Sequence, residues 1–302
     1  MTKAIYELQV ELLLKVLPEI AKESCFALHG GTAINLFVRE MPRLSVDIDL
    51  TYIPIEDRNT SLQNIFEALA RLKANIERAL PASFVQHQRE ISKLQISDHH
   101  AQIKIEVNQT NRGIYAPPQK LILCDIAQEK FDAFCDIPVV SMGQLYGGKL
   151  CAALDRQHPR DLFDVKLLLE NEGFTDDIKK GFLLALLSSN RPIHELLNPN
   201  LSDQQQAFEN QFDGMAMIPF TYKDYETTRE VLIRTVNQCL NEADKQFLLS
   251  VKKLRPDWQI YDFEQFPSVQ WKLQNLKKLR QRNLDKYQKL YENLEEHLFS
   301  KS

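Results

Sequence analysis

The sequence has 302 residues, 44% of them hydrophobic, which is enough to bury one large core or two modest ones. The formal net charge is −4 and the pI is near 6.0, which excludes a globally basic nucleic-acid-binding protein. Five cysteines without a Cys-x-x-Cys pair argue against structural zinc and a disulfide framework. No apolar run is long enough to span a membrane and no signal peptide is present, so we expect a cytoplasmic protein without membrane contact.

The first 137 residues combine helical and strand-like patterns. Apolar residues at helical spacing predict helices, and apolar residues in alternation predict strands. In chain order we expect a helix over residues 2–24, a strand at Cys25–Leu28, a helix from Gly30 to Arg39, a strand at Val46–Tyr52, a helix at Asn59–Leu80 capped by Thr60 or Ser61, and strands at Ser83–His87, Ile91–Ile96 and Gln102–Val107. The mixture is typical of an α+β domain.

After Pro138 the pattern is helical almost to the end. We therefore predict two domains, a mixed one over residues 1–137 and a mostly helical one over residues 138–302, with a shared interface because no Gly/Ser-rich linker separates them. The final predicted helix, over residues 269–298, carries a run of basic residues, and Asp285 is the one acidic residue between them. The basic residues are Lys272, Lys277, Lys278, Arg280, Arg282, Lys286 and Lys289. Such a run is either a solvated face or a surface for RNA backbone, and both interpretations stay open.

Two carboxylates lie two residues apart in the strand predicted at Val46–Tyr52. Asp47 and Asp49 alternate with apolar residues, so both carboxylates share one face of the strand. Two like charges held close repel each other, and folding alone does not favour the arrangement. A divalent cation does, since Mg²⁺ takes carboxylate oxygens and keeps other positions for water and phosphates. We predict that the pair binds Mg²⁺ or Mn²⁺, although a solvated edge strand has the same pattern.

A Gly-Gly-Thr turn lies upstream of the carboxylates, where a predicted strand gives way to a helix. Glycine lets backbone N–H groups approach an anion closely at a helix start, and a threonine at this place caps the helix or contacts the same anion. Ser45 shares the carboxylate face by alternation, so its hydroxyl is expected to point at the substrate. We predict that the nucleotide-binding residues include Gly30, Gly31, Thr32, Arg43 and Ser45.

Glu106 is a candidate third carboxylate. In the strand predicted at Gln102–Val107 it shares a face with Lys104, opposite the apolar residues. If this strand neighbours the one that carries the Asp pair, Glu106 would accept the proton of the acceptor hydroxyl or hold a second metal ion. The alternative is an exposed glutamate paired with Lys104.

Lys149 lies in a predicted helix that two glycines weaken, Gly147 and Gly148. The pair lowers helix propensity by about 2 kcal/mol, which suggests a close backbone approach at this point. A lysine there, as a point charge, suits the tail of a triphosphate. The alternative is a lysine on a solvated helix face.

The Gly-Gly turn followed by Asp-x-Asp on the next strand resembles the DNA polymerase β-like nucleotidyltransferase superfamily. The fuller string, from Gly30 through Arg43-x-Ser45-x-Asp47-Ile48-Asp49, is similar to its AbiEii branch, the toxins of type IV toxin–antitoxin pairs. A second block, Gly148–Asp164, resembles the downstream motif of that branch. The two blocks together are specific, whereas Asp-x-Asp alone is weak.

The resemblance implies a polymerase β-like fold over residues 1–137 and a helical domain that completes the active-site cleft. It implies transfer of NMP from an NTP to an acceptor hydroxyl with release of pyrophosphate, and it points to RNA as the acceptor, at the 3′ end of tRNA. It also implies a cognate antitoxin encoded nearby. In that family an aspartate at the position of Asp161 completes the site. We therefore assign catalysis to Asp47, Asp49, Glu106, Lys149 and Asp161, metal binding to the first three, and phosphate contact to Lys149, with Arg156 and Arg160 as further candidates.

Two other functional classes stay open. A metal-dependent nuclease also uses clustered carboxylates with a lysine, but it has no triphosphate tail for the Gly-Gly turn to bind. A non-catalytic nucleotide-binding module would keep the same fold. Such a module would have lost its activity, and the presence of Asp47, Asp49, Lys149 and Asp161 argues against this.

Overall fold

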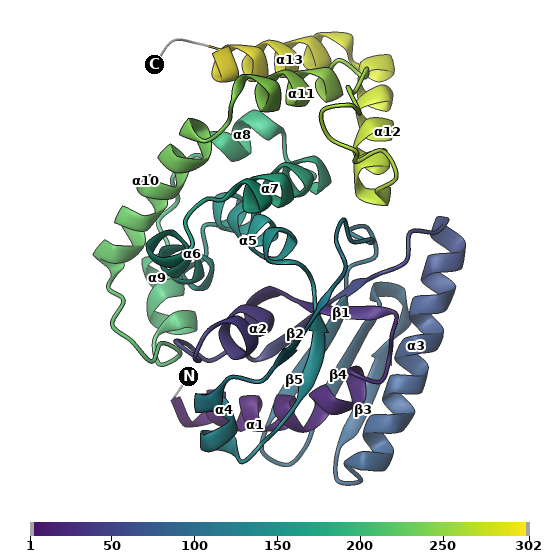
Figure 1. Cartoon of the computed structure of the whole chain (residues 1–302), viewed down its shortest axis with the longest axis vertical. Helices are drawn as coiled ribbons and strands as arrows, with labels where there is room; N and C mark the ends of the chain where they lie inside the picture. Colours follow the sequence, from purple (N-terminus) through teal and green to yellow (C-terminus); the bar gives the residue numbers. More distant parts are fainter. Residues whose placement is uncertain (1–2, 300–302) are drawn as a thin grey trace. The chain divides into compact units, whose positions relative to one another are not determined.

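The structure is a computed structural model that describes residues 3–299 (Figure 1). Its contacts divide the chain into two compact units, which we describe separately. The first unit contains the residues up to Ser141 and a returning segment, Gln204–Tyr222; the second contains Met142–Asp203 and the residues from Lys223 onward.

A seven-stranded mixed sheet forms the first unit, in the order β3-β4-β5-β2-β1-β7-β6. The pairs β2–β5 and β1–β7 are parallel, and the other neighbours are antiparallel. The strands are β1 (Phe26–His29), β2 (Asp47–Tyr52), β3 (Phe84–Gln88), β4 (Lys93–Ser97), β5 (Gln102–Val107), β6 (Gln119–Ile122) and β7 (Asp136–Val139). Together with the many helices, this sheet confirms the predicted α+β fold.

Helices α1 (Lys3–Ile20) and α3 (Arg58–Ala79) cover one face of the sheet (Figure 1). Helix α1 contacts β5 and β7, α3 contacts β3 and β4, and the two helices contact each other. The alternation of β2 buries Ile48 completely, while Asp47 and Asp49 lie half-buried on the opposite side of the strand. The sheet therefore presents the predicted carboxylates on the face that the apolar residues do not use.

Two short strands and a helix near the end of the first unit have no counterpart in the sequence prediction: β6, α4 (Asp125–Phe131) and β7. Each is too short for its periodicity to stand out from the surrounding loop.

The predicted N-terminal cap of α3 is wrong. Asp57 is the N-cap, and its carboxylate accepts the backbone N–H groups of Asn59 and Thr60 at 2.9 and 3.1 Å. Thr60 is thus already inside the first turn.

The second unit is helical. Its helices are α5 (Met142–Arg156), α6 (Pro159–Asn171), α7 (Asp176–Ser188), α8 (Ile193–Leu197), α10 (Tyr222–Gln238), α11 (Glu242–Lys252), α12 (Pro267–Arg282) and α13 (Leu284–Phe299). The returning segment of the first unit holds α9 (Gln205–Ala207) and a π-helical turn, Phe208–Phe212. Within residues 3–299, no helix has both the length and the apolar character needed to cross a membrane.

Helices α5 and α7 pack through glycines. A Cβ atom on Gly147 would lie 2.2 Å from the backbone carbon of Gly181, and a Cβ atom on Gly181 would lie 1.9 Å from the carbonyl oxygen of Gly143. No side chain fits between backbones at this separation. The close approach suggested by the glycine pair beside Lys149 is therefore a helix–helix contact.

The single helix predicted over residues 269–298 is two helices, α12 and α13, separated at Asn283. The Asn283 side chain accepts the backbone N–H of Lys286 at 2.9 Å, so it caps the start of α13 instead of continuing α12. Lys272 does not belong to a solvated face either. Its ammonium donates to the carbonyls of Ser189 and Arg191 at 2.6 and 3.0 Å, next to the end of α7.

Candidate active site

The Gly-Gly turn and the Asp pair meet at the end of β1. Gly30 has a φ of +71°, and a Cβ atom on it would lie 2.3 Å from Oδ2 of Asp49. Only glycine combines this backbone conformation with room for the carboxylate. The antiparallel register places Asp49 opposite His29, directly before the turn. The two motifs, far apart in the sequence, thus form one local structure.

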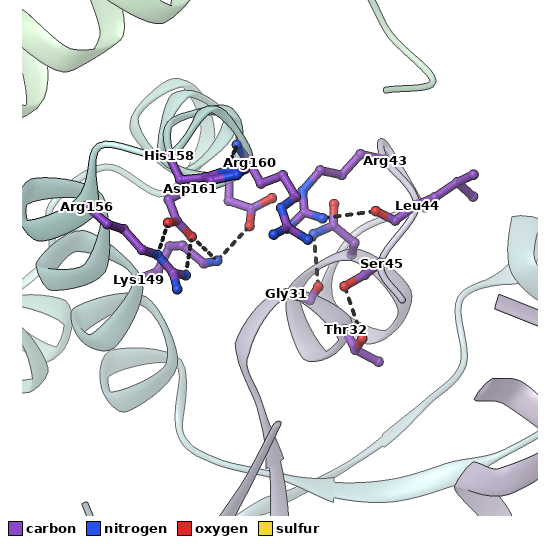
Figure 2. Close-up of polar contacts among 12 residues, drawn as sticks. Gly31, Thr32, Arg43, Leu44, Ser45, Lys149, Arg156, His158, Arg160 and Asp161 are labelled. Carbon is purple, nitrogen blue, oxygen red and sulfur yellow. Dashed lines mark hydrogen bonds and ion pairs between the residues drawn. The ribbon is translucent and has the colours of Figure 1, made fainter. Parts of the chain in front are cut away.

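Arg43 and Ser45 lie against the second glycine of the turn (Figure 2). A Cβ atom on Gly31 would lie 2.8 Å from an Arg43 guanidinium nitrogen and 3.0 Å from the Ser45 hydroxyl oxygen. Arg43 is buried, and its Nη1 donates to the carbonyl of Leu44 at 2.9 Å. The glycine pair is therefore packed by three of the predicted site residues, one acidic, one basic and one hydroxylic.

The returning segment of the first unit holds the backbone that leads to the Asp pair. The N–H of Leu44 donates to the carbonyl of Met215 at 2.9 Å, and Arg43 forms an isolated antiparallel bridge with Ala216. The N–H of Met217 completes the pairing with the carbonyl of Pro42 at 2.8 Å. A segment distant in sequence thus fixes the entry into β2.

Thr32 and Ser45 are both buried, and their hydroxyls contact each other at 3.0 Å. Thr32 Oγ1 also donates to the carbonyl of Asp47 at 2.5 Å. These hydroxyls tie the first turn of α2 (Gly30–Ala33) to the start of β2. Their predicted contact with a nucleotide stays a prediction.

Strand β5 is the parallel neighbour of β2, as the assignment of Glu106 requires. The register pairs Asp47 with Lys104 and Asp49 with Glu106, so the four side chains share one face of the sheet (Figure 1 labels both strands). Nζ of Lys104 lies 3.8 Å from Asp47 and 3.4 Å from Glu106. About a third of each of these three side chains is exposed, so water and ligands can reach the group.

Lys93 is a member of this group that the sequence analysis did not single out. It lies on β4, opposite Glu106, and its ammonium lies 2.9 Å from the Glu106 carboxylate. Burial raises the pKa of Glu106, but Lys93 and Lys104 outweigh it and hold the pKa below its ordinary value. A lowered pKa makes Glu106 a weak proton acceptor, which favours its second predicted role, as a ligand of a cation. Strand alternation in β4 could have identified Lys93.

The residues present fit a hard cation. Two carboxylates on one strand face offer the oxygen ligands that Mg²⁺ prefers, and Mg²⁺ in nucleotide enzymes is held by one or two carboxylates together with substrate phosphates and water. In the part of the chain that the structure describes, no three His, Cys, Asp or Glu side chains are grouped as a ready metal site. Glu106 instead contacts lysines. Asp47 and Asp49 are therefore the first candidates for ligands of the cation, and Glu106, which lies opposite Asp49 in the register, is the third.

Lys149 and Asp161 lie together in the second unit, in a buried ion cluster (Figure 2). The Lys149 ammonium lies 2.9 Å from Asp161 and 3.0 Å from Asp164, and at most 7% of any of these three side chains is exposed. Arg156 adds two bonds to the carboxylate of Asp161, at 2.6 and 3.0 Å. Both carboxylates are thus neutralised within the cluster.

The local structure explains how the cluster forms. Helix α6 begins with Pro159 in its first turn, and Asp161 follows at the position where a carboxylate is favoured by the helix dipole. Burial raises the pKa of Asp161, but Lys149 and Arg156 outweigh it and hold the pKa well below its ordinary value. Asp161 is therefore a carboxylate at every physiological pH. Its predicted role in catalysis, like that of Lys149, stays a prediction.

Gln157 is a structural residue of this region that the sequence did not reveal. It has a φ of +50°, is buried between α5 and α6, and donates to the carbonyl of Asn200 at 2.8 Å. Its side-chain oxygen accepts from Ser202 at 3.1 Å and from Arg229 at 3.2 Å, and its carbonyl accepts from Tyr225 at 2.9 Å. These bonds hold the turn that brings Arg156 onto Asp161. The structural role of Gln157 is apparent only from its hydrogen-bond partners, which are all distant in the sequence.

One comparison with known proteins identifies a family, and a second identifies a shared fold. The profile described as "Nucleotidyl transferase AbiEii toxin, Type IV TA system" matches residues 11–275. Among solved structures, the chain is similar to MenT4, a nucleotidyltransferase toxin from Mycobacterium tuberculosis H37Rv, with a TM-score of 0.62 and 14% sequence identity over 91% of this chain and 99% of that one. At this identity the likeness shows a shared fold. Comparison with curated protein sequences finds no match.

The family match spans both motif blocks and most of the chain, so the predicted resemblance is confirmed. The activity is that of a nucleotidyltransferase, with an NTP as substrate, and a toxin of this type has an antitoxin partner. The chain belongs to the AbiEii nucleotidyltransferase toxins of type IV toxin–antitoxin systems.

Proposed function

We propose that this toxin transfers NMP from an NTP to the 3′-terminal hydroxyl of a tRNA, in a reaction that depends on Mg²⁺ or Mn²⁺ held by Asp47 and Asp49. The contact between Asp49 and Gly30 is the observation that carries the proposal. It brings a metal-binding carboxylate to the turn whose backbone N–H groups suit a phosphate. A triphosphate and its metal ion need this proximity.

Each residue of the first unit then has a distinct task. Asp47 and Asp49 hold the cation, which supplies Lewis-acid polarisation of the α-phosphate when bound. The backbone of Gly30 and Gly31 contacts phosphate oxygens, with the Arg43 guanidinium beside it. Glu106 supports the cation from β5, and Lys104 and Lys93 balance the negative charge of the three carboxylates in the absence of ligand. In-line attack by the acceptor hydroxyl forms one P–O bond and releases pyrophosphate.

RNA as the acceptor is what the resemblance to the AbiEii family implies for this chain. The 3′ end of tRNA is the specific form of this proposal. We expect a direct complex with the antitoxin encoded nearby to inhibit the transfer.

The test is incubation of the purified full chain with Mg²⁺, each α-³²P-labelled NTP in turn, and total RNA. We expect label in a tRNA-sized band with one NTP or a subset of them, loss of the label on chelation, and recovery with Mg²⁺ or Mn²⁺. An Asp47→Ala variant should be inactive. Asp136→Asn is the matched control, because Asp136 is a half-exposed carboxylate of the same sheet, paired with Lys120 on the edge strand.

The other outcomes each overturn a part of the proposal. Label on protein would keep the transfer chemistry and exclude tRNA as acceptor. RNA shortened without label would replace the transferase with a nuclease. Equal labelling by the wild type and Asp47→Ala would exclude the assigned metal site.

A further inference from the structure

A cavity of about 150 Å³ lies inside the second unit, lined by residues of α7, α8, α11, α12 and α13. None of the predicted site residues lines it. An engineered cavity of similar volume in another protein accommodates benzene. The space is thus suited to a compact organic molecule and too small for a nucleotide.

Apolar side chains form one part of the wall. Leu276 and Leu279 come from α12, and Leu290 and Leu294 come from α13. Trp271 also lines the cavity and is 44% exposed, so the space borders the protein surface. A ligand can therefore enter from solvent and bury an apolar body against the leucines.

The charged groups of the wall are all basic. Arg191, His194, Lys252 and Lys272 line the cavity, and no Asp or Glu is among the described residues that do. Arg191 forms an ion pair of 2.7 Å with Asp155, which lies outside the lining. The cavity therefore has a positive potential, which favours an anion over a cation or a neutral molecule.

The two lysines differ in their partners. Lys272 is committed to the backbone carbonyls next to the end of α7, so its ammonium contributes charge but few free donors. Lys252 is 6% exposed, and its ammonium lies 5.4 Å from the centre of the Tyr287 ring. Among residues 3–299, no carboxylate lies within ion-pair distance of Lys252. A buried ammonium without an anionic partner is unfavourable by several kcal/mol, and a ligand carboxylate would relieve this.

Electrostatics agrees with this geometry. Burial lowers the pKa of Lys252 to about 8, and the same cause, with Lys252 adding to it, lowers the pKa of Lys272 to about 8. Burial and the nearby Lys252 also lower the pKa of His194, against a raising effect of Glu195. The ammonium groups of Lys252 and Lys272 thus repel each other, and an anion between them would reduce the repulsion.

We propose that this cavity binds a small organic acid, with its carboxylate on the Lys252 ammonium and its apolar body against the leucines of α12 and α13. The combination of one buried cation without a carboxylate partner and an apolar wall selects the ligand class. Inorganic phosphate would leave the apolar wall unfilled, and a neutral molecule would leave Lys252 unpaired. The site is separate from the residues assigned to nucleotide transfer, so the proposal stands or falls independently of the proposed function.

Benzoate is a suitable probe, and benzamide is its neutral counterpart of nearly equal size. Isothermal titration of the full chain should show that benzoate binds at least tenfold more tightly than benzamide. Lys252→Met keeps the length and apolar volume of the side chain and removes its charge. We expect it to weaken benzoate binding at least tenfold, which corresponds to about 1.4 kcal/mol.

Lys253→Met is the matched control. Lys253 is the next residue, is exposed, and has its ammonium 5.4 Å from the centre of the Tyr291 ring. It does not line the cavity, so its removal should leave benzoate affinity unchanged. Circular dichroism and thermal unfolding of both variants check that the fold is intact.

Fluorescence locates the bound probe. The chain has two tryptophans, and in a Trp258→Phe background Trp271 is the only one left. Benzoate should change the emission of Trp271 over the same concentrations that produce heat. The proposal is overturned if benzoate does not bind or if benzamide binds equally well. It is also overturned if Lys252→Met binds benzoate like the wild type, or if Lys253→Met weakens binding as much as Lys252→Met does. A constant emission of Trp271 while heat is released would place the bound benzoate elsewhere and overturn it too.

Discussion

The chain has two clusters of acidic and basic side chains, and they are built in opposite ways. The cluster on β2, β4 and β5 is about one-third exposed, with Lys104 at 3.4 and 3.8 Å from its carboxylate neighbours. The cluster on α5 and α6 is buried, with Lys149 at 2.9 and 3.0 Å from two carboxylates. Ion pairs that water can reach contribute little to stability and can exchange partners, whereas a buried pair is disrupted only at a high cost. The first arrangement suits ligand binding, and the second suits a fixed structure.

The largest effect expected is on activity in the open cluster. Asp49→Asn removes one of the two carboxylates assigned to the cation while keeping the shape that packs on Gly30. We expect nucleotide transfer to fall by about 10³-fold, or ~4 kcal/mol of transition-state stabilisation, with little change in melting temperature. The measurement is label transfer alongside thermal unfolding. An active Asp49→Asn enzyme would contradict the assignment of the open cluster to ligand binding.

The next effect is on stability in the closed cluster. Lys149→Met removes the ammonium that lies 2.9 Å from Asp161 and 3.0 Å from Asp164, and both carboxylates stay buried. We expect a loss of about 3–5 kcal/mol in the free energy of unfolding. Lys104→Met is the matched control, since it removes a lysine from the open cluster, and it should cost about 1 kcal/mol or less. Urea unfolding of both variants measures the difference, and equal losses would contradict the distinction.

Lys252 gives a third case, a buried lysine without a carboxylate. Its pKa, about 8 in the fold, lies below that of the unfolded chain, so the unfolded chain binds more protons between pH 8 and 10.5. The free energy of unfolding should therefore rise with pH across this window, by about 3 kcal/mol. His194, Lys272 and Tyr287 face the same group and titrate as well.

Comparison with Lys252→Met isolates the contribution of Lys252. Without ligand, the variant should be more stable than the wild type at pH 7, and the advantage should disappear by pH 10.5. Removal of a buried lysine would thus stabilise the protein at Lys252 and destabilise it at Lys149. A constant difference from pH 7 to 10.5 would show that Lys252 is not charged and unpaired in the fold.

The smallest effect on stability concerns the glycine turn. Gly30 and Gly173 both have φ near +70°, but a Cβ atom meets Asp49 at Gly30 and nothing within 4 Å at Gly173. Each substitution by alanine should cost about 1 kcal/mol of backbone strain. At Gly30 the added Cβ atom also lies 3.1 Å from the Cβ atom of Asp49, so we expect transfer to fall at least tenfold and stability to fall somewhat more than in Gly173→Ala. Equal activities of the two variants would show that the Asp49 contact has no functional role.

Local patterns predicted much of the first unit. The alternation around Asp47 and Asp49 fixed their common face, and the same rule placed Glu106 with Lys104. The Gly-Gly turn was recognisable because φ above zero restricts the residue type. The two motif blocks together identified the family. Each of these conclusions depends on residues a few positions apart.

Other features depend on partners far away in the chain. Three contacts join segments that sequence periodicity treats separately. They are the pairing of β2 with β5, the backbone hydrogen bond between Leu44 and Met215, and the contact of Gly147 with Gly181. Burial of Lys272 against the end of α7 removes it from the basic run, which the sequence analysis interpreted either as a solvated face or as a surface for RNA backbone. Short elements such as α4 owe their existence to such contacts as well.

The sequence by itself determined the family and the face of the strand on which the candidate residues lie, because side-chain direction follows from backbone periodicity alone. Only the tertiary structure decided how those residues are used, because burial and ion pairing depend on what packs against them. Asp49 and Asp161 are the same residue type in equally specific motifs. The first lies half-buried at a glycine turn, and the second is closed in by Lys149 and Arg156. Desolvation and charge neutralisation, which no local pattern encodes, make that difference.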